Sequence, residues 1–191
     1  AFGVIGNASP KDVQVKWTEH YTQGACTIKL GEKKWGVVLP KGDRKVQLHE
    51  MGHVLFSSFE ASAISSELDA LARNLEAILE DARIDTQTSE WYREDIKTYH
   101  GDLLFGEGVG KNDTVVDATV AIAYELPVTL GDTGKKLAGK FGRRIQTVQY
   151  SDDPWATARL AYEISKEFEG ADEPKPEPEP EPKPESEPSP E

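Results

Sequence analysis

His49-Glu50-Met51-Gly52-His53 is an H-E-x-x-H pentapeptide, and it decides how the rest of the chain is interpreted. On an α-helix, residues four apart lie on one face with their Cβ atoms about 5–6 Å apart, so both imidazoles can bind one zinc ion. Glu50 follows the first of them and would lie beside the metal, where it can act as general base toward a zinc-activated water molecule. The pentapeptide therefore predicts a zinc site and a helix that carries it. The alternative is a surface helix in which two histidines stand four apart by chance.

The segments around the pentapeptide predict a small sheet followed by helices. Alternating or continuous apolar residues, typical of β-strands, occur at 12–17, 26–30 and 35–39. The helix of the pentapeptide is expected from about Arg44 to Phe59, with Asp43 as its N-cap. Further helices are expected at 90–99, 114–126 and 155–168, whereas the glycine-rich segment 131–144 is expected to form a loop or a broken helix. The predicted fold class is α+β, a mostly helical domain with a small antiparallel sheet before the H-E-x-x-H helix.

The third metal ligand is expected on a helix that begins near Ser62 or Ser65 and runs to about Asp85. One face of this helix carries apolar, mostly small residues seven apart, namely Ala63, Ala70, Ala77 and Ile84. Glu80 projects from the same face, where burial of an unpaired carboxylate would cost free energy. A bound cation would offset this cost. The predicted Zn²⁺ ligands are therefore His49, His53 and Glu80, with a water molecule completing the usual catalytic set.

Other side chains compete for a place in the site. Asp81 is an alternative to Glu80 as the third ligand. Asp81 and Asp85 are also candidates for supporting roles, as hydrogen-bond acceptors for the ligand histidines or as partners of Arg83. His100 is a second candidate for the third ligand, because it begins a His-Gly-x-x-Leu-Phe segment similar to the His-Gly-x-x-Phe-like motif that follows H-E-M-x-H in SprT/Spartan-like proteases. A group that stabilises an oxyanion is also expected. The candidates for it are Tyr92, Tyr99 and His100.

Composition excludes several classes of partner. The chain has 191 residues with 34 acidic and 22 basic side chains, a net charge of −12. It therefore lacks the basic footprint that nucleic-acid binding requires. No stretch of about 18 apolar residues is present, so no membrane-spanning segment is expected. The single cysteine, Cys26, cannot form an internal disulfide, and the N-terminal ten residues do not resemble a signal peptide, so a cytoplasmic location is expected.

The last part of the chain differs from the rest in composition. Residues 171–191 contain eight acidic residues, two lysines and eight of the twelve prolines, and they contain no apolar residue beyond Ala171. Such a segment cannot bury a core. The predicted organisation is therefore one folded domain at 1–170, which carries the pentapeptide, and a disordered acidic linker or tail at 171–191.

Two motifs together resemble a known family. The pentapeptide and Glu80-Asp81-Ala82-Arg83-Ile84-Asp85, about forty residues in all, are similar to zincin-like metallopeptidase domains of bacteria and phages. These domains occur beside von Willebrand factor A domains and include proteins similar to the cobaltochelatase T subunit. In this chain Asp85 stands where the family usually has a glutamate. The resemblance implies that Glu80 binds the metal and that an edge of the sheet binds an extended peptide.

Two functions follow as expectations from the motifs and the resemblance. The first is a zinc-dependent metallopeptidase that hydrolyses a peptide or protein substrate, with Glu50 as general base. The second is a non-catalytic, zinc-stabilised assembly module, tethered through the acidic segment to a von Willebrand A-type partner domain. The two differ in whether the bound zinc keeps a coordination position open for water.

Overall fold

The computed structural model describes residues 12–18, 26–31, 34–58, 60–61, 69–109 and 113–170. The predicted acidic segment 171–191 and the predicted helix start at Ser62 or Ser65 lie outside these ranges. Within them, six helices accompany a three-stranded sheet, which confirms the α+β class. None of the helices in these ranges combines the length and the hydropathy that crossing a membrane requires.

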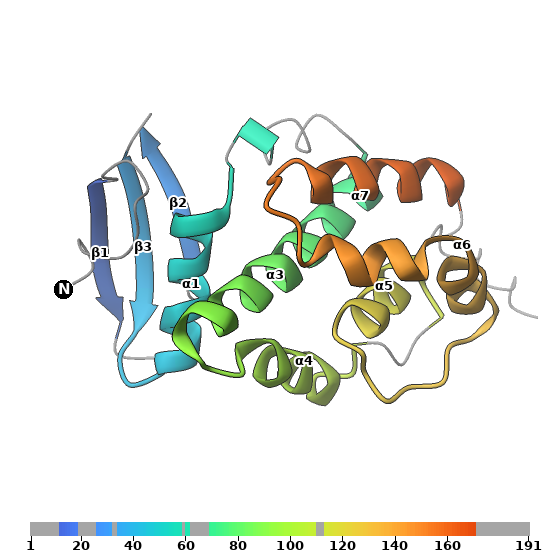
Figure 1. Ribbon diagram of the computed structural model, residues 1–191, viewed down its shortest axis with the longest axis horizontal. Helices are drawn as coiled ribbons and strands as arrows, with labels where there is room; N and C mark the ends of the chain where they lie inside the picture. The colour runs from blue at the N-terminus through green and yellow to red at the C-terminus, as the bar shows by residue number, and fades with distance from the viewer. Residues whose placement is uncertain are drawn as a thin grey trace, which may run out of the picture.

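The sheet is mixed, so the expectation of a purely antiparallel sheet is wrong for one strand. Strands β1 (Asp12–Thr18), β2 (Cys26–Gly31) and β3 (Lys34–Pro40) lie in the order β1-β3-β2. β2 pairs with β3 in antiparallel fashion, as the short connection between them requires. β1 is separated from β3 by an intervening strand in the sequence, and it pairs with β3 in parallel. β3 is thus central, and β2 is the edge strand nearest to helix α1 (Figure 1).

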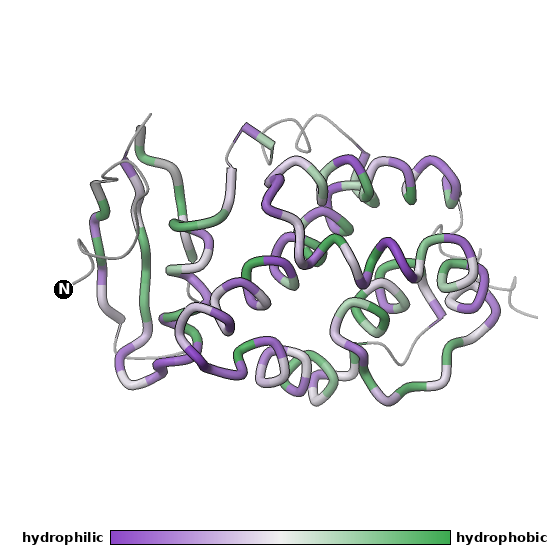
Figure 2. The backbone as a smooth tube through the Cα atoms, viewed as in Figure 1, coloured by the Kyte–Doolittle hydropathy of each residue, from purple (hydrophilic) through white to green (hydrophobic). Residues whose placement is uncertain are grey.

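Helix α1 (Arg44–Phe56) packs its buried face on this sheet. The Asp43 side chain caps the helix by accepting a hydrogen bond of 3.1 Å from the Val46 backbone nitrogen, as predicted. A small core joins the two elements through Trp35, Val37, Leu39, Met51 and Val54. Figure 2 shows the corresponding hydrophobic character along most of β3. The predicted helix therefore forms, although it ends three residues earlier than expected, at Phe56.

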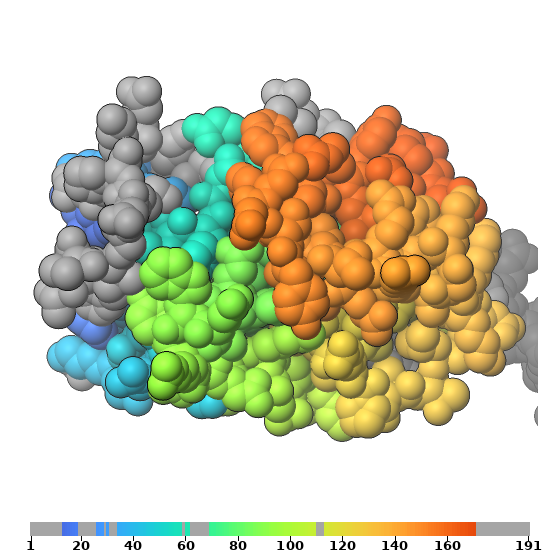
Figure 3. Space-filling model, in the orientation of Figure 1, coloured from blue at the N-terminus to red at the C-terminus, as the bar shows by residue number. Residues whose placement is uncertain are grey.

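Helix α3 (Ala70–Tyr92) runs through the middle of the molecule and contacts both of its halves (Figure 1). On one side lie α1 and the sheet, and on the other lie α5 (Val115–Ala123), α6 (Asp132–Val148) and α7 (Ala156–Glu167). Helix α4 (Ile96–Gly106) follows α3 after a short turn, so the helix predicted at 90–99 is divided between the two. Figure 3 shows the same division at the surface, with the blue and cyan N-terminal elements at one end and the yellow and orange C-terminal ones at the other.

The segment 131–144 forms a continuous helix, which corrects the expectation of a loop or a broken helix. Helix α6 extends over seventeen residues despite its glycines. Leu137, Phe141 and Ile145 recur at helical spacing, and each is buried in the main core. Glycine in a helix costs about 1 kcal/mol relative to alanine, whereas burial of one large apolar side chain contributes about 1.5–3 kcal/mol. Tertiary packing therefore outweighs the local preference of this segment.

Gly52, inside the pentapeptide, lets α1 and α3 approach closely. A Cβ atom at this position would overlap Thr88 Oγ1 and would lie 3.3 Å from Ile84 Cδ1. Thr88 is fully buried, and its hydroxyl has no hydrogen-bond partner in the described part of the chain. The tight contact thus brings the histidine-bearing helix against the helix that carries Asp81 and Asp85.

Replacing this glycine is expected to lower stability. Gly52→Ala should reduce the free energy of unfolding by about 1–3 kcal/mol, because overpacking between the helices exceeds the roughly 1 kcal/mol gained in helix propensity. Urea denaturation of the metal-free protein measures the change. Adding Thr88→Ala opens the space and should recover most of the loss. A Gly52→Ala variant as stable as wild type would contradict the close approach.

Candidate metal centre

The two histidines of the pentapeptide project together from α1. The ring centroids of His49 and His53 lie 5.0 Å apart, with the ring planes nearly perpendicular at 89°. Both side chains are mostly but not fully buried, and both line a cavity of about 530 Å³ between β2, α1, α3 and α4. The helical spacing therefore brings the two imidazoles to one site that solvent can reach.

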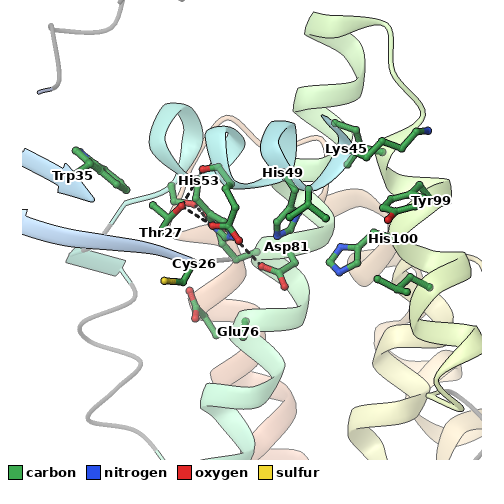
Figure 4. A pocket seen from close by; sticks show the side chains of 17 residues that line it. Cys26, Thr27, Trp35, Lys45, His49, His53, Glu76, Asp81, Tyr99 and His100 are labelled. Atoms are coloured by element: carbon green, nitrogen blue, oxygen red, sulfur yellow. Dashed lines mark hydrogen bonds and ion pairs between the residues drawn. The ribbon is translucent and has the colours of Figure 1, made fainter. Parts of the chain in front are cut away.

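Asp81 is the carboxylate that forms a possible metal-binding group with both histidines. Its Oδ1 lies 3.2 Å from His53 Nε2, and one donor atom from each of His49, His53 and Asp81 lies within 4.8 Å of the others. Two atoms bound to one zinc ion at about 2.0–2.1 Å and at a tetrahedral angle are roughly 3.3 Å apart. Figure 4 shows the three side chains directed toward one another from α1 and α3. The distance between His53 and Asp81 is close to this value, and the three groups are of the types that can hold a metal ion.

Asp85 has a different relation to the histidines. Its fully buried carboxylate lies 2.5 Å from His49 Nδ1 through Oδ1 and 2.8 Å from His100 Nδ1 through Oδ2. These distances are typical of charge-assisted hydrogen bonds and are too short for two ligands of one zinc ion. With Nδ1 donating to Asp85, each neutral ring keeps its lone pair on Nε2. Asp85 therefore orients the two rings as a hydrogen-bond acceptor. This is one of the supporting roles for which the sequence made it a candidate.

The charges of this cluster stabilise one another. Burial lowers the pKa of His49, but the hydrogen bond to Asp85 and the charges of Asp85, Asp81 and Glu50 outweigh burial and raise the pKa to about 9. Burial raises the pKa of Asp85, yet its hydrogen bonds to His100 and His49 lower it to about 2. Burial also raises the pKa of Asp81, but the hydrogen bond to His53 and the neighbouring imidazoles give a net decrease. Both aspartates are therefore ionised at neutral pH, as metal ligation and its support require. A pKa of about 9 keeps His49 protonated at neutral pH in the metal-free protein, so a metal bound at Nε2 would displace that proton.

Tyr124 adds a further contact from the far half of the molecule. It follows α5, and its hydroxyl donates to Asp85 Oδ2 at 3.3 Å and lies 3.2 Å from His100 Nδ1. Burial, followed by the charge of Asp85, raises its pKa well above the usual value, so the hydroxyl stays protonated. Its position at the end of an apolar segment gave no sequence signal for this role.

Glu80, the predicted third ligand, is occupied by another partner. Arg83 donates from Nε to Glu80 Oε2 at 2.9 Å and from Nη2 to Oε1 at 2.7 Å, and Thr157 donates to Oε2 at 3.0 Å. The carboxylate is buried, as the sequence indicated, but a guanidinium supplies its counter-charge. Within the described ranges, two groups of side chains bring three possible ligand atoms close together: His49, His53 and Asp81, and His49, Asp85 and His100. Glu80 belongs to neither group. The structure brings Asp81 to the two histidines instead.

Arg83 also fixes the end of the histidine-bearing helix. Its side chain is 1% exposed, and Nη2 donates to the backbone oxygen of Phe56, the last residue of α1, at 2.7 Å. Nη1 donates to the backbone oxygen of Ser151, ahead of α7, at 3.3 Å. One guanidinium thus joins α1, α3 and the approach to α7, which sets how the histidines of α1 face α3.

Glu50, the predicted general base, is buried at the same cavity. Its side chain is held by the Thr27 hydroxyl, which lies 2.6 Å from Glu50 Oε2. Thr27 lies in β2, twenty-three positions away, and no sequence motif pointed to it. Of the candidates for oxyanion stabilisation, Tyr99 and His100 line the cavity, whereas Tyr92 does not. The Tyr99 hydroxyl donates to Asp43 Oδ2 at 3.3 Å.

The family resemblance rests on the two sequence motifs alone. Comparisons with models of protein families, with curated proteins and with solved structures found no match.

Proposed function

We propose that this protein is a zinc-dependent peptide hydrolase in which His49, His53 and Asp81 bind the metal. The observation that carries the proposal is the clustering of these three donor groups in one cavity with the Glu50 carboxylate. Two imidazoles and one carboxylate leave a fourth tetrahedral position for water or substrate. That composition is typical of catalytic zinc sites rather than of closed structural ones.

Each residue has a separate task in this proposal. When bound, zinc supplies a Lewis acid that activates water and polarises the scissile carbonyl. Asp85 orients His49, while Ser57 Oγ lies 3.0 Å from His53 Nδ1 and orients the second ring. Glu50 accepts a proton from the attacking water and then donates one to the leaving amine.

The position of β2 supports a peptide as the substrate. β2 is an edge strand of the described sheet, and Cys26 and Thr27 from it line the cavity beside His53 (Figure 4). An extended peptide can pair with such an edge through backbone hydrogen bonds. This arrangement would bring a scissile bond along β2 to the proposed metal ligands.

Substitution of the general base tests the proposal. Glu50→Gln should reduce cleavage of a peptide library by about 10²-fold or more, because general-base catalysis contributes that much. Its zinc content, measured by elemental analysis, should equal that of wild type, since Glu50 is not a proposed ligand. His53→Ala is the matched control, and it should lose both zinc and cleavage. A wild-type protein that binds one zinc ion but cleaves no member of the library would instead support the assembly module.

A further inference from the structure

We infer that Thr27 is a positioning residue that holds the Glu50 carboxylate in the orientation in which it acts as a base. This inference rests on the proposed function, because it assigns a role in the same reaction. Thr27 belongs to the sheet rather than to either helix of the metal centre. The base would therefore be held by the strand along which the substrate is proposed to lie.

The contact between Thr27 and Glu50 is short and well shielded. Thr27 Oγ1 lies 2.6 Å from Glu50 Oε2 and 3.1 Å from the backbone oxygen of the same residue. A hydroxyl has one proton to donate, and the shorter of the two distances indicates that the carboxylate oxygen is its main acceptor. Glu50 is 6% exposed. Little water therefore competes for this hydrogen bond.

The arrangement leaves half of the carboxylate available for chemistry. Among the residues that the structure describes, Thr27 is the only hydrogen-bond partner of the Glu50 side chain, and it engages Oε2 alone. Oε1 therefore accepts no hydrogen bond from the part of the chain that the structure describes. A glutamate has three rotatable side-chain bonds, and its free rotation would disperse the position of Oε1. Fixing one oxygen defines the position of the other, which is the condition for efficient proton transfer.

Thr27 also links the base to the edge of the sheet. Its backbone belongs to β2 and pairs with β3, opposite Val37. Its side chain reaches α1 one residue after the first histidine of the pentapeptide. A peptide that pairs with β2 would contact the same strand that orients Glu50. Substrate binding to β2 would therefore also influence the position of the Glu50 carboxylate.

Two substitutions separate the hydroxyl from the shape of the side chain. Thr27→Val keeps the branched shape and removes the donor, and it should lower kcat by about 10–100-fold while KM changes by less than about threefold. Thr27→Ser restores the hydroxyl and should recover most of kcat. Thr18→Val is the matched control, because the Thr18 hydroxyl donates to the Leu39 backbone oxygen within the sheet, and it should leave kcat unchanged.

A second measurement tests the contact without relying on catalysis. In the metal-free protein, Thr27→Val should lower the folding equilibrium constant by about 10–100-fold, the range expected for a hydrogen bond to a charged group. In a Glu50→Met background the same substitution should have a clearly smaller effect, because the carboxylate acceptor is absent and only the backbone oxygen of residue 50 remains within reach of the hydroxyl. Urea denaturation of the four proteins of this double-mutant cycle gives the coupling.

The outcomes distinguish this inference from the proposed function. Coupling in the cycle together with a loss of kcat that Thr27→Ser restores supports the positioning role. Equal kcat in wild type and Thr27→Val, or no coupling in the cycle, overturns it and leaves the proposed function standing. A wild-type protein without zinc-dependent cleavage overturns the proposed function and with it the catalytic role of Thr27.

Discussion

Zinc is expected to bind the Asp81→Asn variant about 10²–10³-fold more weakly than it binds wild type. A structural zinc site with four protein ligands has an apparent binding free energy of roughly 10–16 kcal/mol at neutral pH, and an equal division among these ligands gives about 2.5–4 kcal/mol for each. Asparagine keeps the shape of the side chain but removes the negative charge that a cation requires. Competition titration against a chromophoric zinc chelator measures the affinity directly.

The matched control is the neighbouring carboxylate. Glu80→Gln should retain wild-type zinc affinity within about threefold once folded, because Arg83 and Thr157 already occupy its oxygens and it contributes no metal ligand. Circular dichroism at low temperature establishes that the titrated variant is folded. The reverse result, with zinc lost in Glu80→Gln and kept in Asp81→Asn, would return the third ligand to Glu80. Loss of zinc in His100→Ala but not in Asp81→Asn would instead assign it to His100.

Arg83→Met is expected to lower the free energy of unfolding by about 3–5 kcal/mol, the usual cost of leaving one member of a buried ion pair without its partner. The variant leaves the buried Glu80 carboxylate without its guanidinium and removes the donors to Phe56 and Ser151. Urea denaturation of the metal-free protein measures this loss separately from any effect on zinc.

An exposed ion pair provides the comparison for this prediction. Arg144 pairs with Glu163, and both side chains are about half exposed. Arg144→Met should therefore cost less than about 1 kcal/mol. Replacing both buried partners, as in Glu80→Leu with Arg83→Met, should recover part of the stability lost in Arg83→Met alone. Equal costs for Arg83→Met and Arg144→Met would show that the buried pair does not hold α1 on α3.

The sequence predicted those features that depend on local spacing. The H-E-x-x-H helix and its Asp43 cap follow from residues within one or two turns, and both are present. α6 is a counter-example, because its glycines suggested a break while packing against distant helices decided the outcome. The parallel pairing of β1 with β3 also lies beyond local rules, since it depends on how the chain is routed between strands.

In the candidate site, too, the features that depend on local spacing were predicted and those that depend on tertiary packing were not. The sequence brought two histidines and Glu50 together, and it placed a carboxylate pair at Glu80 and Asp81 on the following helix. It did not distinguish the two acids, because the partner that takes Glu80 is chosen by three-dimensional packing around Arg83. Thr27 and Tyr124 reach the site from other elements, and neither has a spacing relation to the pentapeptide.

Helix α3 presents Asp81 and Asp85 to the histidines. Glu80 and Arg83, which alternate with these aspartates in the chain, pair with each other and tie the helix to α1 and α7. Each residue of an α-helix is turned by about 100° from the one before it. One residue inserted between 70 and 79 would therefore rotate Asp81 and Asp85, together with Glu80 and Arg83, away from their partners. If these four residues kept their contacts, the first part of the helix would instead lose its packing in the core. This segment should consequently tolerate amino-acid substitutions far better than insertions or deletions. A library of single insertions and deletions along the chain would find its least tolerant positions here.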